Sequence, residues 1–527
     1  MPQTFTPPSI RSTAAVLPIL WLLWLLPLAA AGQAEPGEKG KTEADSAQSV
    51  AADPEGAEPA ARPGWRERLV FTFSERLRGE SVDWFRPRPG ASPEGAGRYS
   101  FVGSQLRAGA RFTAPSFQIV AEVQDTRLFG LPEDANRPAP FGNLGPGANY
   151  FAQELKRNPG RAFLKQGYVT ARRSGLSATL GRFDHGDGLE SLPTDPTLLW
   201  LRRSRLAERL VGSYGYSHVT RSFDGLRAGY DRPEWNATVL WVRPTQGGFE
   251  LDAKEEIRRV ALSGITFTFK SPGGSSSQEI ASDLRLFYLG YEDRRGELLQ
   301  TDNRPRPLRE ADRKPIRVHT FGGHATVVRP AGPGLADGLL WAAIQRGVWG
   351  DLDHAGWAGA AEIGYQLPTL AGSPWVRAGI NRSSGDRDPG DGRHGTFFQP
   401  LPTPRIYAQF PFFNLMNLDD RFVQLIARPH DRVTVRADFH RLALGRSSDL
   451  WYSGGGAISN AGFGYSGIPS GGHRELARLA DLGVTVQCAA RLTLYAYFGR
   501  ALPGAVIEST FRDRAASYGY LEATFRY

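Results

Sequence analysis

Arginine dominates the residues of this sequence that could bind a ligand by charge. The chain has 527 residues, and of its 63 lysines and arginines only seven are lysine, so 56 are arginine. A planar guanidinium group can hold a carboxylate or phosphate through two parallel hydrogen bonds. A GC-rich coding sequence would also enrich arginine. Six arginines lie on the polar side of segments in which apolar and polar residues alternate: Arg172, Arg227, Arg285, Arg317, Arg377 and Arg436.

Acidic residues share these polar faces. They include Asp283, Glu362 and Asp438, and the run Arg436, Asp438 and His440 occupies every second position of one segment. Such a mixture would attract anions and still release them, because neighbouring acids weaken each contact. The alternative is that the arginines pair with the acids and brace a wide structure. The sequence leaves both roles open.

No other set of residues predicts catalysis or a metal site. The nine histidines are scattered without an H-E-x-x-H pattern, and the single Cys488 excludes a multi-cysteine site. The acids Asp419 and Asp420 are expected to be solvated in a loop. We therefore predict no enzyme, no cofactor and no metal. The net charge of +9 would suit nucleic acid, but no module that reads nucleic acid occurs, so we predict no such partner.

The segments that carry these residues have the pattern of β-strands. Apolar and polar residues alternate between clusters of Gly, Pro, Asp and Asn, for example in 283–291, 432–440, 481–488 and 491–498. Runs of about 9–11 residues are long enough for a tilted strand to cross a bilayer. The sequence therefore predicts an all-β fold, a transmembrane antiparallel β-barrel, wide enough to enclose an aqueous channel.

The last segment and the tryptophans support this prediction. Leu521, Ala523, Phe525 and Tyr527 share one face, and the final residue is aromatic, a pattern similar to the C-terminal strand of bacterial outer-membrane proteins. Aromatic girdles mark both interfaces of such barrels. The tryptophans expected in these girdles are Trp235, Trp241, Trp341, Trp349, Trp357 and Trp375.

The connections predict the orientation of the barrel. With the C-terminus in the periplasm, short turns fall at 428–432 and 489–490, and long connections at 381–420, 446–473 and 501–515 fall outside the cell. This asymmetry is typical of outer-membrane barrels. Roughly 25 residues per strand and connection predict about 16–20 strands, and bacterial barrels have an even number.

The first 64 residues precede the predicted barrel. In residues 1–34, Arg11 comes before a short apolar stretch and small residues, which predicts a signal peptide for export. An uncleaved anchor helix is the alternative. Residues 35–64 are rich in Ala, Glu, Pro and Gly and lack aromatic residues, so we predict a disordered acidic linker. The barrel is assigned to residues 65–527.

Several segments, taken in order, resemble the alginate export family of outer-membrane porins over residues 65–527. They are 124–127, 180–184, 221–227, 383–398, 414–417, 449–456 and the strand with Arg436, Asp438 and His440. The resemblance implies an 18-stranded barrel with an arginine-lined lumen, and it adds Arg182 to the lumen residues. It also implies passage of a polyuronate. The family has a long periplasmic turn before the penultimate strand, whereas this chain has a short turn at 489–490.

Two classes of function remain open. The first is an outer-membrane porin that passes an anionic polysaccharide or organic acid, or a general or substrate-specific uptake porin without a role in polysaccharide export. The second is an adhesin that uses the long loops. The expected partners are an anionic polysaccharide or small anionic solute, outer-membrane lipid and the barrel assembly machinery. The sequence predicts neither the oligomeric state nor the direction of flux.

Overall fold

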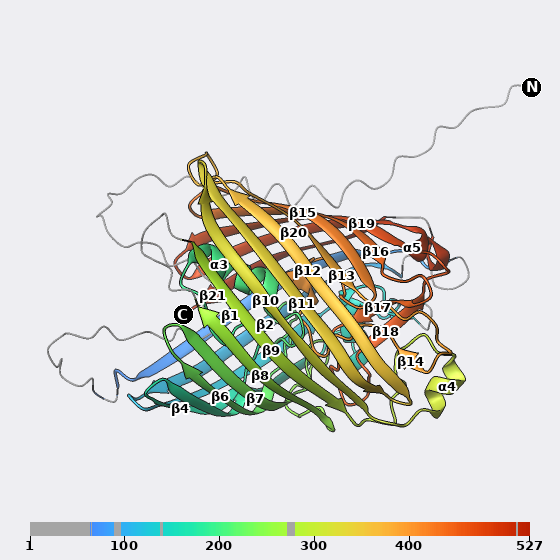
Figure 1. The fold of residues 1–527 in the computed structure, drawn as a ribbon, viewed down its shortest axis with the longest axis horizontal. Helices are drawn as coiled ribbons and strands as arrows, with labels where there is room; N and C mark the ends of the chain where they lie inside the picture. Colours follow the sequence, from blue (N-terminus) through green and yellow to red (C-terminus); the bar gives the residue numbers. More distant parts are fainter. Residues whose placement is uncertain (1–63, 65, 89–95, 138–140, 271–279, 513–514) are drawn as a thin grey trace, which may run out of the picture. The chain divides into compact units, whose positions relative to one another are not determined.

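A computed structural model describes residues 64, 66–88, 96–137, 141–270, 280–512 and 515–527. The predicted signal peptide, and all of the predicted linker except Gly64, lie outside these residues. One sheet contains 19 strands, of which β14 (Arg393–His394) is a two-residue addition to β12, and the other 18 form the barrel wall. The last strand, β21, pairs with the first, β1, so the described wall is closed (Figure 1). The predicted antiparallel barrel is confirmed.

The wall strands follow chain order around the barrel. Their bounds are β1 (Leu69–Asp83), β2 (Arg98–Thr113), β3 (Phe117–Phe129), β4 (Gly160–Arg173), β5 (Leu176–Phe183), β6 (Phe223–Asp231), β7 (Trp235–Pro244), β8 (Val260–Lys270), β9 (Ala281–Asp293), β10 (Ile316–Ala331), β11 (Gly334–Trp349), β12 (Leu352–Gln366), β13 (Trp375–Ser383), β15 (Leu418–His430), β16 (Val433–Leu444), β19 (Glu475–Ala489), β20 (Leu492–Pro503) and β21 (Ala516–Arg526). Each wall strand pairs with its chain neighbours, and closure satisfies the backbone groups that an open edge would expose to lipid.

The two ends of the barrel differ as the sequence predicts. One end has tight turns such as the one between Ala489 and Leu492, which pair with each other. The other end carries the long connections, which hold the remaining elements. These are α2 (Pro146–Glu154), α3 (Pro196–Leu201), the π-helical turn η1 (Arg202–Leu206), α4 (Arg306–Ala311), the 3-10 turn η2 (Pro404–Ile406), the hairpin β17 (Leu450–Gly454) and β18 (Tyr465–Pro469), and α5 (Ala505–Thr510). Among the described residues, no helix is long and apolar enough to span a bilayer.

Alternation along each strand separates an outer from an inner face. In β10, Val318 and Thr320 are buried, whereas Arg317, His319 and Phe321 are exposed. The outer face carries exposed Leu, Ile, Val and Phe side chains all around the barrel, as a lipid-facing belt requires. Leu521 and Phe525 of β21 and Tyr527, which follows it, are also exposed, so the predicted apolar stripe of the last strand is confirmed.

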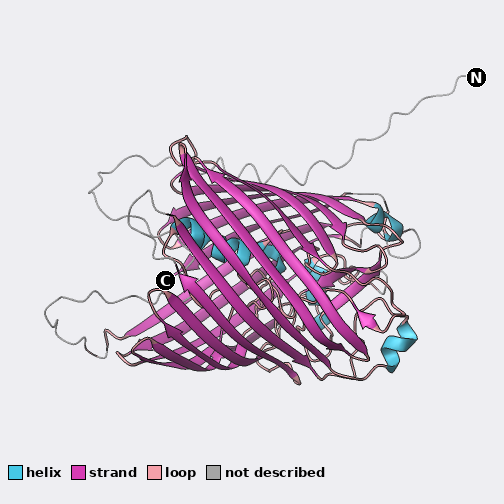
Figure 2. Cartoon of the chain, in the orientation of Figure 1, coloured by secondary structure: helices cyan, strands magenta, loops and turns pink. Residues whose placement is uncertain are grey.

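The girdle prediction is wrong for half of the tryptophans. Trp241 and Trp357 are exposed on the outer face, but Trp341, Trp349 and Trp375 are buried inside the barrel. They are buried because two long connections fold into the barrel and pack against its inner face. Residues 184–222 join β5 to β6, and residues 384–417 join β13 to β15; Figure 2 shows helical segments behind the front strands.

The width of the barrel predicts an aqueous channel, but the in-folded connections occupy part of the interior. Phe397, Phe398 and Phe410 of the connection 384–417 join a buried hydrophobic cluster with inward residues of the wall, such as Trp341 and Tyr518. This packing fixes two polar loops inside the barrel, where their charged side chains meet those of the strands.

Candidate functional site

The connection 184–222 brings three arginines to the inner wall. Asp195 caps α3 by accepting a hydrogen bond from the backbone N–H of Leu198. The helix continues into η1, which carries Arg202 and Arg205, and Arg209 follows three residues after η1 ends at Leu206. All three are buried, at 1%, 0% and 1% exposure. A buried guanidinium requires a carboxylate or several acceptors, which the wall strands supply.

We call this arrangement the interior ion cluster: Arg202, Arg205, Arg209, Arg285, Arg377, Glu190, Asp283, Asp337 and Glu362. Each pair joins a loop residue to a strand residue or joins residues of the three successive strands β11, β12 and β13. Arg202 lies 2.6 Å from Asp283, Arg285 lies 2.8 Å from Glu190, and Arg377 contacts Asp337. Five guanidinium groups thus face four carboxylates, and the cluster locks the in-folded loop to the wall.

Glu362 of β12 is the centre of the interior ion cluster. Its carboxylate lies 2.9 Å from Arg205, 3.0 Å from Arg377 and 3.6 Å from Arg209. Arg209 is the least directly paired of the three. It donates to Asn381 at 3.0 Å and to the carbonyl of Arg205, and its guanidinium lies 4.2 Å from the centre of the Tyr407 ring.

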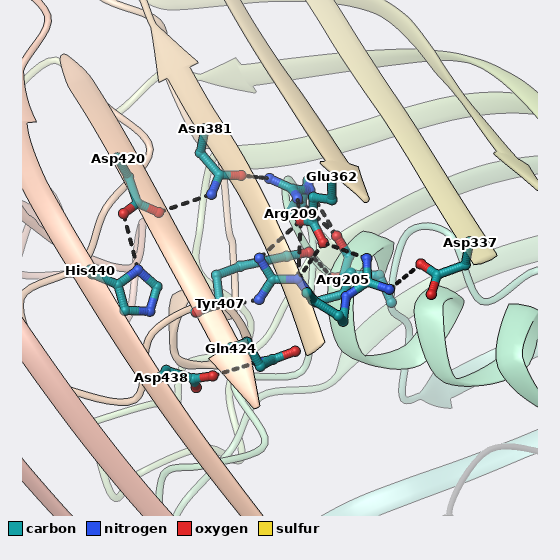
Figure 3. A network of polar contacts seen from close by, with 12 residues as sticks. Arg205, Arg209, Asp337, Glu362, Asn381, Tyr407, Asp420, Gln424, Asp438 and His440 are labelled. Carbon is teal, nitrogen blue, oxygen red and sulfur yellow. Dashed lines mark hydrogen bonds and ion pairs between the residues drawn. The ribbon is translucent and has the colours of Figure 1, made fainter. Parts of the chain in front are cut away.

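A chain of hydrogen bonds runs from the interior ion cluster along the neighbouring strands of the wall. The amide of Asn381 donates to Asp420 at 2.9 Å, and Asp420 lies 3.0 Å from Nδ1 of His440 (Figure 3). Asp438, two residues before His440, accepts a hydrogen bond from Gln424. Polar contacts therefore extend from β12 through β13 and β15 to β16.

The two in-folded connections also bind each other. Val211 and Leu401 form a parallel bridge, and the N–H of Gly212 donates to the carbonyl of Leu401. The N–H of Thr403 donates to the carbonyl of Glu208. Burial at this contact raises the pKa of the Glu208 carboxyl to about 7. The two loops therefore form one structural unit inside the barrel.

Three predicted arginines face the interior and remain partly exposed. Arg172 of β4 donates to Gln118, Arg227 of β6 lies 5.3 Å from the centre of the Phe183 ring, and Arg436 of β16 lies 2.7 Å from Asp438. Their side chains are neither lipid-facing nor buried in the interior ion cluster. We call them the wall arginines.

Two more predicted arginines, Arg285 and Arg377, face the interior but are buried in ion pairs. They sit at 2% and 1% exposure within the interior ion cluster. The predicted arginines therefore divide into two groups: the wall arginines are partly exposed, and Arg285 and Arg377 are buried in ion pairs that join the in-folded loop and the wall strands.

The placements of Arg317 and Arg182 in the lumen are wrong. Arg317 lies on the outer face of β10, with its side chain 58% exposed and 3.6 Å from Glu292. Arg182 shares the outer face of β5 with the exposed Leu180 and forms two hydrogen bonds with Asp224, at 2.7 and 2.6 Å. For Arg317 the reason is visible in β10: its inward residues Ile316 and Val318 are apolar because they pack against the loop core.

Asp438 and His440 face the interior and are buried, at 5% and 1% exposure. The expectation of solvated loop acids at 419 and 420 is wrong. Both lie in β15; Asp420 is fully buried between Asn381 and His440, and Asp419 forms an ion pair with Arg382 at 2.7 Å. Both acids therefore belong to a paired strand and contact protein side chains, so they are not the solvated loop acids that the sequence predicts.

Sequence reasoning missed Arg202, Arg205 and Arg209. A signal was available, because the three arginines recur at the spacing of one helical face after the capping sequence Asp195–Pro196. The interior ion cluster has one more guanidinium group than carboxylates, and the side chains of all its members are buried. The described residues around it offer no nucleophile paired with a base.

Comparisons with known proteins agree with this architecture. The model of the alginate export family matches residues 67–517. No curated protein matches the chain. Among solved structures, a BenF-like porin from Pseudomonas fluorescens Pf-5 is similar with a TM-score of 0.53 and 10% identity, over 88% of this chain and 99% of that one.

Two further porin structures have the same fold. OccAB2 of Acinetobacter baumannii is similar with a TM-score of 0.51 and 9% identity, over 88% of this chain and 98% of that one. OccK2 (OpdF) of Pseudomonas aeruginosa, solved in complex with glucuronate, is similar with a TM-score of 0.51 and 11% identity, over 88% and 99%. At these identities the likeness extends to the barrel fold alone.

Proposed function

Because the chain belongs to the alginate export family and is an outer-membrane porin, we propose that it passes an anionic polysaccharide or organic acid through its lumen by facilitated diffusion. The preferred solute carries uronate carboxylates, spaced so that successive units can meet guanidinium groups. The loops 184–222 and 384–417 narrow the path along which the solute moves.

The observation that carries this proposal is the position of the wall arginines. Arg172 and Arg227 lie on β4 and β6, and Arg436 lies on β16, nearly opposite them in the strand order. A carboxylate of the solute can pass from a guanidinium group on one side of the lumen to the next one, provided that each contact is weak. Two unit charges 4 Å apart interact by about 1 kcal/mol in water and about 4 kcal/mol at an effective dielectric of 20.

A uronate solute has further support. The structural neighbour OccK2 was solved with glucuronate bound, and a uronate is the monomer type of alginate-like polymers. That protein shares only the fold, so its ligand guides the choice of solute to test first.

Planar-bilayer conductance of the purified porin tests the proposal. We expect anion selectivity that falls with rising salt, because screening shortens electrostatic reach to about 10 Å at 0.1 M, and block by oligouronates. The variants Arg172→Gln, Arg227→Gln and Arg436→Gln should each lower anion preference, with a larger loss in combination. Arg317→Gln is the matched control, since it removes the same charge from the outer face. A cation-selective native channel contradicts the proposal.

A second candidate function is uptake of small anions without a role in polysaccharide export. The short turn between Ala489 and Leu492 supports it, because the family's long periplasmic turn is absent there. The same bilayer experiment separates the two candidates. If glucuronate monomers block the channel as strongly as longer oligomers do, uptake of small anions is favoured. If block strengthens with oligomer length, passage of a polymer is favoured.

Export of the chain rests on its first residues. We propose that residues 1–34 are a signal peptide, that residues 35–64 form a flexible acidic linker, and that the assembly machinery and lipid of the outer membrane receive the barrel. Mass spectrometry of the mature N-terminus tests the first part. A mature porin that is found in the outer membrane and still begins at residue 1 contradicts the signal-peptide proposal.

A further inference from the structure

A group of potential ligand atoms lies on the inner face of β15, β16 and β19. Strand register places Gln424 opposite Asp438, and Asp438 opposite Asp481. His440 is two residues from Asp438 and so shares its face. Ligand atoms of Asp438, His440 and Asp481 all lie within 4.8 Å of one another. The sequence predicts no metal here, because these residues come from strands far apart in the chain.

Several buried atoms at this place have no hydrogen-bond partner. Three of them could bind a metal: Nε2 of His440, Oδ2 of Asp481 and Oε1 of Gln424, whose side chains are more than nine-tenths buried. Nη2 of Arg436, which can only donate, is also without a partner. One such buried atom typically costs about 1–3 kcal/mol. Three of them in neighbouring residues of one face indicate that something else satisfies them.

The surrounding residues hold these side chains in the orientation that a metal requires. Asp420 binds Nδ1 of His440 at 3.0 Å, which leaves Nε2 free, and a carboxylate on the second ring nitrogen is the usual arrangement for a metal-binding histidine. The hydroxyl of Tyr497 donates to Oδ1 of Asp481 and leaves Oδ2 free. Arg436 and Gln424 both donate to Asp438.

The charge balance also favours a dication. Asp438 and Asp481 stand directly opposite each other, an arrangement that repels when both are ionised. Asp420 adds a third carboxylate, and Arg436 is the cation that contacts Asp438. A metal bound through Nε2 of His440 replaces any proton there, and three acids and one arginine then leave two negative charges, which one divalent ion would neutralise.

We propose that Asp438, His440 and Asp481 bind a divalent first-row transition-metal ion such as Zn²⁺, with Oε1 of Gln424 available as a further ligand. An imidazole nitrogen beside carboxylate oxygens suits Zn²⁺ or Co²⁺ better than Ca²⁺ or Mg²⁺. Three atoms 4.8 Å apart lie about 2.8 Å from a common centre, so ligand bonds of about 2.1 Å require each side chain to move inward by about 0.7 Å at most. The ion joins β16 to β19 and, through Asp420 and Asn381, braces the wall that faces the in-folded loops.

The test uses the full-length porin in detergent after treatment with a chelator. We expect one equivalent of Co²⁺ to give ligand-field absorption that Zn²⁺ displaces, and we expect Zn²⁺ but not Ca²⁺ to raise the melting temperature. His440→Gln and Asp481→Asn should each weaken binding at least tenfold. His324→Gln is the matched control, because His324 is also a buried histidine that contacts an aspartate, Asp283 at 3.2 Å, and it should leave binding unchanged.

Equal binding by native porin and His440→Gln overturns the proposal, as does a native porin that binds no Co²⁺ or prefers Ca²⁺. If the variants do not fold, X-ray absorption of the native Zn²⁺ complex decides: one nitrogen and two or more oxygen ligands support the site, and a different ligand set overturns it. None of these results depends on which solute the porin passes.

Discussion

The arginines of the wall and those of the in-folded loop are chemically identical, but their surroundings give them different roles. Arg172, Arg227 and Arg436 project from strands and remain partly exposed. Arg205 and Arg209 come from the connection 184–222 and are buried against Glu362. The charge of an arginine buried in an ion pair is balanced by its carboxylate partner, whereas a partly exposed arginine can still attract a solute.

This difference indicates that the loops and the wall can be altered separately. Changes at the wall arginines should affect which ions pass. Changes in the interior ion cluster should affect whether the loops stay inside the barrel.

Glu362→Gln should have the largest effect, because it leaves Arg205 and Arg377 without their shared carboxylate. Loss of one partner of a buried ion pair typically costs about 3–5 kcal/mol. We expect a lower midpoint of urea unfolding, and higher, noisier conductance as the loop 184–222 detaches. Glu122→Gln is the control, because Glu122 faces the interior from β3 but lies 3.9 Å from Arg107 and is part-exposed. Equal losses in both variants would show that Glu362 has no special role.

Arg209→Gln should cost less than Glu362→Gln. The substitution removes hydrogen bonds to Asn381 and to the carbonyl of Arg205, but Glu362 keeps Arg205 and Arg377 as partners. Hydrogen bonds from charged groups contribute about 1.5–3 kcal/mol. Urea unfolding measures the difference, and a cost for Arg209→Gln as large as that for Glu362→Gln would contradict the order of pairing that the distances imply.

The contact between the connections 384–417 and 445–474 should depend on pH. The carboxyl of Asp449 accepts from the N–H of Asp386, and burial together with Asp449 raises the pKa of Asp386 to about 6 from its usual 3.8. The closed loops therefore hold this proton more tightly than opened loops do. Their contact should be strongest below about pH 4, weaken as the pH rises to about 6, and change little above that.

The shift of Asp386 is about two pKa units, or about 3 kcal/mol, and most of it takes effect between pH 4.5 and pH 7, so we expect protease cleavage of these loops to rise on the order of twentyfold over that range. A protease active at both values measures it, with cleavage of the unfolded porin as reference. In Asp386→Asn most of the pH dependence should disappear, and burial of the Asp449 carboxyl, which raises its pKa, accounts for the remainder. An unchanged pH dependence would assign the effect to another group.

The sequence predicted the wall well because one rule governs it. Successive side chains point to opposite faces, and lipid demands apolar residues on one of them. The rule fails where the inner face is apolar too. Val318 and Trp341 pack against the in-folded loops, so polarity no longer distinguishes inside from outside, and Arg317 is assigned to the wrong face.

The interior ion cluster could not be predicted in the same way. Arg205 and Glu362 are 157 residues apart, and only the folding of a connection into the barrel brings them together. Asp420 and His440 are only 20 residues apart, but their contact could not be predicted either, because it depends on β15 beginning before Asp420. Local patterns identify which residues share a strand face, but not which loop covers that face.

Arg182→Gln should have the smallest effect and gives the sharpest test of the comparison. Arg182 forms two short hydrogen bonds with Asp224, so by geometry alone it is as well paired as Arg205. The side chains of this pair are 13% and 20% exposed, however, and lie on the outer face outside the interior ion cluster, whereas those of Arg205 and Glu362 are fully buried. Because the pair keeps some contact with its surroundings, we expect Arg182→Gln to lower the free energy of urea unfolding by about 1 kcal/mol, less than Arg209→Gln, and to leave ion selectivity unchanged. Asp224→Asn, alone and together with Arg182→Gln, completes a double-mutant cycle. The cycle separates the interaction energy of the pair from the effect of losing one charge. A selectivity loss like that of Arg172→Gln would mean that the position of an arginine relative to the wall does not decide its role, because Arg182 and Arg172 carry the same charge on neighbouring strands and differ chiefly in the face they occupy.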